Sequence, residues 1–244
     1  MTRPKLAQDP QTATSLEQHH ERRLAHLEAK IAEKSTDRTE AFSDGVFAIA
    51  ITLLVLEIVV PRVAGGDGER HLPKDLLQAL AHEWPSYLSY VLTFVMLGST
   101  WINHHIMFNY VVRVDRMILA FNTLLLLVIA LNPFPAALLA QGIADRNNLE
   151  ADPHSLAIAS IIFSSVQIMG GVFYNATWLY AVRRGLIAKE ADPKQVKQLT
   201  RISLIYPLIF VISIGLAFVS PEASLLIYVL VPLAYVLPNS TDRF

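Results

Sequence analysis

Polar side chains interrupt the long apolar segments of this chain at three places. Asp44 lies in the first of these segments, His104 and His105 lie in the second, and Asn122 lies in the third. Carboxylate, imidazole and amide groups form hydrogen bonds or bind metals, and an unpaired carboxylate is unfavourable in hydrocarbon. These residues are therefore the candidates for a hydrogen-bonded network, a proton relay or a metal site.

The depth of these groups in the membrane is compatible with a single network. Counting from the polar residue at the nearest helix end, Asp44, His104 and Asn122 each lie five or six residues deep. At 1.5 Å per residue, all three come to about 8–9 Å from the same surface. We expect Asp44 to accept hydrogen bonds from side chains of the other two segments, with Ser43 as a further member; the available donors are Trp101, His104, His105 and Asn122.

Metal binding, proton transfer and enzymatic catalysis have less support in the sequence. Adjacent histidines on a helix point about 100° apart, and the apolar segments offer only Asp44 and Glu57 as acids. A metal site needs further carboxylate or imidazole ligands. The network, the proton relay and the metal site remain open as alternatives. No HExxH, GxSxG or paired-carboxylate motif predicts an enzyme, and no cofactor or resident metal is expected.

The composition indicates a membrane protein. Hydrophobic residues make up 53% of the 244 residues, whereas about 45–50% is usual in soluble domains. The formal net charge of −1, without a basic patch interleaved with aromatic residues, excludes nucleic acid as a partner. The absence of cysteine excludes disulfides and thiolate chemistry.

Six segments are apolar enough to predict an all-α, polytopic fold with six transmembrane helices: 41–60, 85–108, 117–140, 155–182, 202–220 and 223–237. Pro133 and Pro135 predict a bend near the outer end of the third helix. Residues 15–34 form an amphipathic pattern, typical of a helix that packs on its neighbours or assembles subunits. We therefore divide the chain into a leader (1–37), a six-helix membrane domain (38–238) and a short tail (239–244).

The basic residues predict the orientation. With the N-terminus inside, only Arg62, Arg70, Lys74 and Arg146 of the 20 lysines and arginines fall outside. Because basic residues are enriched in cytoplasmic loops, we expect both termini in the cytoplasm.

The first apolar segment is one-sided. When successive residues are set about 100° apart, Ser43, Asp44 and Phe47 point to one side of the helix. The opposite arc carries no charge and contains Phe42, Gly45, Ile49, Thr52, Leu53, Leu56 and Val60. A helix that faces only lipid has no need of such a division.

The first and second segments resemble a known family. Arg38, Phe42, Ser43, Asp44 and Gly45 form the pattern RxxxFSDG, which VFAIAITLLVLEI follows, and the second segment contains Trp101, His104 and His105. Together these residues make the chain similar to bacterial members of the transmembrane protein 175 family, and the resemblance extends through all six segments. It implies a potassium-permeable cation channel in the cell membrane. It also implies a homotetramer, with the first helix of each subunit around a central pore.

The resemblance also implies roles for individual residues. Ile49 corresponds to the apolar constriction, Leu53 and Leu56 to further pore-lining layers, and Thr52 to the hydroxyl associated with potassium preference. Arg38, Phe42, Ser43 and Asp44 correspond to the network that braces the pore helix. No TVGYG filter occurs in the chain, so we expect a hydrophobic gate at Ile49.

Plainer interpretations of these residues exist. Apolar residues at this spacing are typical of ordinary helix packing, and the Thr52 hydroxyl can bond to a carbonyl of its own helix. A proton-coupled secondary transporter is the alternative function, with Asp44 and the imidazoles as working groups. That class usually has inverted repeats and broken half-helices, which the sequence does not show. A membrane scaffold assembled through the leader helix is the third alternative.

Overall fold

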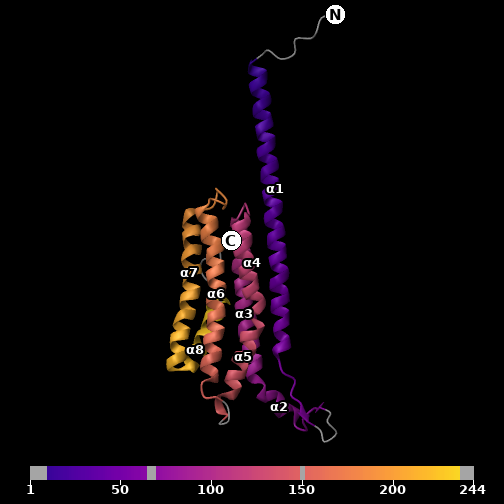
Figure 1. Cartoon of the computed structure of the whole chain (residues 1–244), viewed down its shortest axis with the longest axis vertical. Helices are drawn as coiled ribbons and strands as arrows, with labels where there is room; N and C mark the ends of the chain where they lie inside the picture. The colour runs from indigo at the N-terminus through magenta and orange to yellow at the C-terminus, as the bar shows by residue number, and fades with distance from the viewer. Residues whose placement is uncertain (1–9, 65–69, 149–151, 237–244) are drawn as a thin grey trace, which may run out of the picture.

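The computed structural model describes residues 10–64, 70–148 and 152–236, which fold into a bundle of long helices (Figure 1). Leader residues 1–9 and the predicted tail, 239–244, lie outside the described residues. Within the described part, the strands are limited to the antiparallel hairpin of β1 (Val63–Ala64) and β2 (Arg70–His71). The prediction of a helical fold is confirmed.

The bounds of the helices follow the apolar segments, with shifts at several ends. The long helices are α1 (Pro10–Leu53), α3 (Trp84–Tyr110), α4 (Arg116–Leu131), α5 (Pro133–Ala144), α6 (Ser155–Arg183), α7 (Pro193–Val219) and α8 (Pro221–Val236). The short ones are α2 (Leu76–His82) and the 3₁₀ turns η1 (Leu54–Glu57) and η2 (Asp145–Asn147).

Helix α1 is one continuous helix of 44 residues. The sequence predicted a leader helix over 15–34 and a separate membrane helix over 41–60. The gap between the two helices and the end at Val60 were both wrong. No glycine or proline stands between Lys34 and Ala41 to interrupt the helix. At its other end, α1 stops at Leu53 and passes through η1 into extended backbone, because β-branched residues precede Pro61 and the residue before a proline disfavours helical dihedrals.

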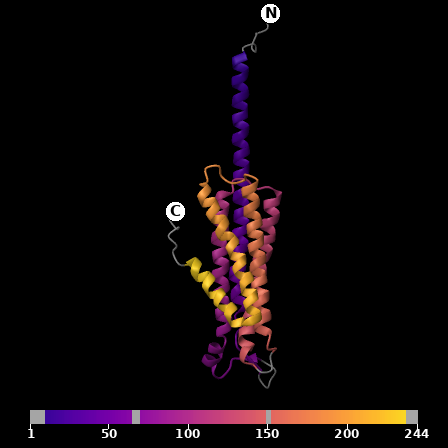
Figure 2. The ribbon, with the colours of Figure 1, turned by 90° about the vertical axis from the view of Figure 1, so that its left-hand side faces the viewer.

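The bundle places α1 at one side, against α3 and α4, while α7 and α8 form the opposite side (Figure 1). Helix α6 lies between them, in contact with α4, α5, α7 and α8. The hairpin and α2 lie at the end of the bundle away from the N-terminus. In Figure 2, the N-terminal half of α1 projects beyond the other helices.

The third apolar segment bends where the prolines predicted. It is divided into α4 and α5 at Asn132, directly before Pro133. Asn132 donates from Nδ2 to the carbonyl of Val128 at 2.9 Å and accepts from Gln167 Nε2 at 2.8 Å. The side chain of Asn132 therefore stabilises the bend and ties it to α6.

Helices α6 and α7 approach closely at a glycine of the pair Gly170 and Gly171. A Cβ atom placed on Gly171 would lie 3.1 Å from Cβ and 3.2 Å from Cδ of Pro207, which is inside α7. A Cβ on Gly170 would meet only Val128, at 3.6 Å. The close approach therefore depends on Gly171 rather than on both glycines.

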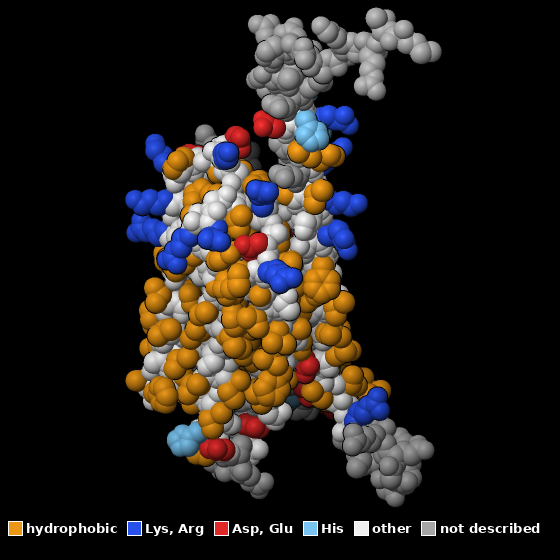
Figure 3. All heavy atoms as spheres, turned by 45° about the horizontal axis from the view of Figure 1, so that its top comes forward, with side chains coloured by type: hydrophobic (Ala, Val, Ile, Leu, Met, Phe, Trp, Pro, Cys, Tyr) orange, Lys and Arg blue, Asp and Glu red, His pale blue; other side chains and the backbone are white. Residues whose placement is uncertain are grey.

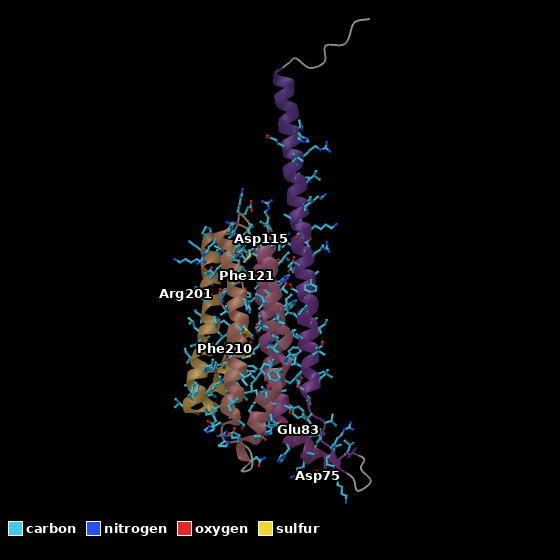
Figure 4. All side chains as sticks on the ribbon, viewed as in Figure 1. Asp75, Glu83, Asp115, Phe121, Arg201 and Phe210 are labelled. Carbon is cyan, nitrogen blue, oxygen red and sulfur yellow. The ribbon has the colours of Figure 1, made fainter. Side chains whose placement is uncertain are left out.

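Asp115 fixes the start of α4, near the end of the bundle from which α1 projects (Figure 4). Its Oδ1 accepts hydrogen bonds from the backbone N–H groups of Met117 and Ile118, both at 3.0 Å, and its Oδ2 accepts from the Tyr180 hydroxyl at 2.7 Å. Desolvation favours the neutral acid, but these hydrogen bonds and the charge of Arg184 outweigh it and lower the pKa of Asp115. The carboxylate is therefore a charged N-cap.

A wide apolar band crosses the face of the bundle shown in Figure 3, and blue Lys and Arg side chains gather above it. Among the described residues, four helical stretches are long and apolar enough to cross a membrane: Lys30–Glu57, Arg116–Ala144, Ser155–Arg183 and Pro193–Val219. Helix α3 has 27 residues but contains Asn103, His104 and His105, and α8 is apolar but short. Length and apolarity alone therefore support four of the six predicted crossings.

Candidate functional site

The side of α1 that the sequence singled out is uncovered in the protomer. Ile49 is 61% exposed, Leu53 is 43% exposed and Leu56, on η1, is 73% exposed. We call this surface the open face; it consists of Phe42, Gly45, Ile49, Thr52, Leu53 and Leu56, all of which are exposed. Val60, which the sequence placed on the same arc, lies beyond the helix in extended backbone.

The opposite side of α1 is buried against α3 and α4. Ser43, Phe47, Ala50 and Leu54 are at most 2% exposed, and they recur at intervals of four, three and four residues, which is one face of a helix. The three apolar residues pack in a cluster with side chains from α3, α4 and α5: Leu97, Leu125, Leu126, Ile129 and Ala136. Helix α1 is thus anchored on one side and open on the other.

Thr52 lies on the open face, and its hydroxyl bonds back to its own helix. The Oγ1 atom donates to the carbonyls of Ala48 and Ile49, both at 2.9 Å. This is the plainer interpretation that the sequence allowed. A hydroxyl that donates its proton inward keeps lone pairs free to accept, so Thr52 also presents oxygen on the open face.

A buried hydrogen-bonded chain connects α3, α4 and α1. The common depth predicted that His104 and Asn122 would meet, with Asp44 as their acceptor and Ser43 as a further member, but Asp44 lies outside this chain. His104 Nε2 lies 2.9 Å from Asn122 Oδ1, and Asn122 Nδ2 donates to Ser43 Oγ at 2.9 Å. Ser43 then donates to the carbonyl of Thr39 at 2.8 Å. His104, Asn122 and Ser43 are at most 2% exposed, so the chain is shielded from solvent. It joins α1 to α3 and α4, the two helices against which the anchored side of α1 packs.

The position of His104 determines its protonation pattern. Because Asn122 Oδ1 is an acceptor, the bond requires a proton on Nε2. The Nδ1 atom is buried and has no hydrogen-bond partner in the described part of the chain. The ring stacks on Phe108, with centroids 4.6 Å apart, and lies tilted against Phe47 at 5.4 Å. These contacts are those of a structural histidine packed between aromatic rings.

Asp44 accepts a hydrogen bond from Trp101 rather than from an imidazole. The distance from Trp101 Nε1 to Asp44 Oδ1 is 2.9 Å. Of the four donors that the sequence offered, His104 and Asn122 bond to each other instead. The fourth, His105, stacks on the Trp101 ring with centroids 6.3 Å apart.

His105 contacts an acid that the sequence did not single out. Its Nδ1 lies 2.7 Å from Oε1 of Glu40, although that oxygen lacks a partner with hydrogen-bond geometry. The contact is therefore an ion pair when the imidazole is protonated. The available signal was spacing, because Glu40 precedes Asp44 by one helical turn and so lies on the same side of α1.

Arg38 remains apart from this network. Its side chain is exposed, and the hydrogen bonds and ion pairs of the described residues do not include it. Nor do three or more His, Asp or Glu side chains come together in the described part of the chain in a way that could hold a metal ion. The geometry is that of a helix packed on one side and uncovered on the other.

The sequence matches a family of channels. The family model described as "Endosomal/lysosomal potassium channel TMEM175" matches residues 38–133, which contain α1 from Arg38 onward, α3 and α4. A protein from Streptomyces collinus named as a potassium channel is 39% identical over 203 residues, which are 81% of this chain and 90% of that protein. A second, from Chamaesiphon minutus, is 35% identical over 192 residues, which are 77% of this chain and 87% of that protein.

Solved structures and animal relatives extend the comparison. The fold matches the crystal structure of a lysosomal potassium-selective channel TMEM175 homologue from Chamaesiphon minutus with a TM-score of 0.69 and 30% identity, covering 84% of this chain and 98% of that one. The zebrafish endosomal/lysosomal proton channel TMEM175 is 36% identical over 150 residues, which are 61% of this chain but only 27% of that protein.

Proposed function

Because the chain belongs to the TMEM175 family of potassium channels, we propose that it forms a homotetrameric, potassium-permeable cation channel whose pore is lined by the open face of α1. Potassium is the permeant ion, other copies of the chain are the partners, and conduction requires no cofactor. The subunit crosses the cell membrane six times. The four strongly apolar stretches form four of these crossings, and α3 and α8 form the other two. Both termini lie in the cytoplasm.

The exposure of one whole side of α1 is the observation that carries this proposal. Large apolar side chains such as Phe42, Ile49 and Leu56 are 61–73% exposed, although the helix that bears them is firmly packed on its other side. In a membrane protein a contiguous exposed apolar surface is covered either by lipid or by another subunit, and the match to a channel family favours the second for the open face. Symmetry-related copies of α1 that surround one axis would cover this surface and enclose a water path.

A hydrophobic gate supplies the mechanism. Four Ile49 side chains around an axis leave a narrow apolar neck that loses water, so ions stop there without a charged barrier. Opening the channel means widening this ring. Thr52, three residues farther along the helix, presents its oxygen to a partly dehydrated ion while its proton stays on the helix carbonyls. Potassium is larger and more weakly hydrated than sodium, and sheds its water at lower cost.

Flux into liposomes tests the gate. We expect Ile49→Ser to raise potassium flux, because a polar ring holds water in the neck. The matched control is Leu208→Ser on α7, where an apolar side chain of similar exposure, 60%, lies on a helix outside the α1 contacts. An Ile49→Ser protein that folds and assembles normally but conducts no better than the Leu208→Ser control would refute the proposal.

The same assay distinguishes other functions. Animal relatives are named proton channels, so proton flux is recorded beside potassium and sodium flux with a pH-sensitive dye. Flux that saturates and requires a countergradient of protons would favour the proton-coupled transporter. A complete absence of flux in the assembled protein would favour the scaffold.

A further inference from the structure

The N-terminal part of α1 stands clear of the bundle (Figures 1 and 2). Between residues 19 and 31, every side chain that the structure describes is exposed. Three of them are large and apolar: Leu24 is 47% exposed, Leu27 52% and Ile31 70%. In a lone helix these side chains would remain in water, and their regular spacing is what indicates a partner.

The three apolar residues form a single seam. The intervals from Leu24 to Leu27 and from Leu27 to Ile31 are three and four residues, which is the alternation of the core positions of a coiled coil. With about 100° per residue they fall within about 60° of one another around the helix. We call these three residues the leader seam.

The leader seam continues the direction of the open face. On a helical wheel of α1, Phe42, Ile49 and Leu53 lie on the same side as the leader seam. Each falls inside the arc that the seam covers or at most about 20° outside it. Helix α1 is unbroken between the two surfaces. Ser35 and Arg38 occupy the same sector between them, so the leader seam is a separate contact surface about three turns away from the open face.

We propose that the leader seam is a subunit interface whose occupant is the same seam of other copies of this chain. The leader helices then form a parallel coiled coil on the cytoplasmic side, coaxial with the pore. This inference rests on the proposed function, because it requires the α1 helices to surround one axis. When the open faces point to that axis, the continuous helix directs the leader seams to the same axis.

The charges beside the leader seam fit such a ring. Arg23 and Lys30 lie on one flank, about 70–90° from the middle of the seam, and Glu21 lies about 90° away on the other flank. All three are exposed. In a ring of parallel helices, one flank of each helix meets the opposite flank of its neighbour, so basic side chains approach an acidic one.

Cysteine crosslinking of the full-length protein tests the interface, since the natural chain contains no cysteine. Leu27→Cys places a thiol in the leader seam. Glu33→Cys places a thiol at another exposed position of the same helix, about 150° from the middle of the leader seam. Leu53→Cys reports assembly at the open face. Each variant is purified in detergent and treated with a short bis-maleimide, and the products are separated on denaturing gels.

We expect the Leu27→Cys band to shift from monomer to dimer while Glu33→Cys stays monomeric. Crosslinking of Leu53→Cys without Leu27→Cys would overturn the coiled coil and leave the channel assembly intact. Equal crosslinking of Leu27→Cys and Glu33→Cys would reveal random collision and also overturn it. Absence of crosslinking at both Leu27→Cys and Leu53→Cys would overturn the coaxial assembly that the proposed function requires.

Discussion

The buried bond between His104 and Asn122 makes a quantitative prediction. In Asn122→Leu, the Nε2–H of His104 loses its acceptor and remains buried between aromatic rings. A buried donor without a partner costs about 1–3 kcal/mol. His104→Leu leaves Asn122 Oδ1 without its donor, at a similar cost. In the double variant, two apolar side chains meet and neither penalty is present. The two single losses of about 2 kcal/mol each should therefore not add.

The coupling free energy between the two sites should be about 1–2 kcal/mol, which is well above the deviation of about 0.3–0.5 kcal/mol seen for independent sites. For a chain of this size, 1 kcal/mol corresponds to about 2–4 °C in the unfolding midpoint. Each single variant should lose about 4–8 °C, and the double variant should lose clearly less than the sum of both.

The measurement is the apparent unfolding midpoint in detergent, taken at one fixed heating rate because unfolding of membrane proteins is often irreversible. Thr123→Val is the matched control. Thr123 follows Asn122 on α4, but its side chain is exposed and bonds only to its own helix, so the midpoint should stay within about 1 °C. A double variant whose loss equals the sum of the two single losses would refute a direct bond between His104 and Asn122.

Two further predictions concern the helices that hold this network in place. Asp115→Ala should lower stability by about 0.5–2 kcal/mol through loss of the α4 N-cap. Because the folded-state pKa of Asp115 is lowered, this contribution is complete above the ordinary carboxylate pKa and disappears as the pH falls through the folded-state pKa. The unfolding midpoints of the natural protein and of Asp115→Ala should therefore converge in acid. A difference that stays constant with pH would contradict the charged cap. Gly171→Ala should destabilise the α6–α7 contact by about 1–3 kcal/mol, because its Cβ would press on a proline, whereas Gly170→Ala, measured in parallel, should be tolerated.

Periodicity and depth made much of this structure predictable from the sequence. The division of α1 into an anchored and an open side follows from angular spacing. The meeting of His104 and Asn122 follows from their equal depth, with Ser43 as the further member that the sequence offered. The bend at Asn132 follows from the prolines beside it. Each of these features depends on local geometry that a helix imposes on its own residues.

Features that depend on how one helix is rotated against another were not predictable. Trp101 and His105 are one turn apart and face the acids of α1, while His104 points about 100° away toward α4. The depth of these residues does not determine that rotation, so the sequence left four donors open for Asp44 and overlooked Glu40. The continuous α1 was missed for a different reason: a change in composition near residue 38 was interpreted as a boundary, although the backbone has no cause to stop there.

The two sides of α1 belong to one rigid element, and this connects the stability of the network to conduction. Phe47 and Ala50 on the anchored side alternate along the helix with Ile49 and Thr52 on the open face. A shift of the helix against α3 and α4 therefore moves the Ile49 ring. Asn122→Leu should change potassium flux, because it loosens the contact between α4 and α1.

Gly171→Ala is the matched comparison for this effect, because it disturbs the contact between α6 and α7 rather than the packing of α1 on α3 and α4. The comparison is made where the two variants have lost the same free energy of unfolding. Potassium flux through Asn122→Leu should then differ from that of the natural protein, whereas flux through Gly171→Ala should equal it. Equal flux changes in both would show that general loosening of the bundle, rather than the position of α1, controls the path of the ion.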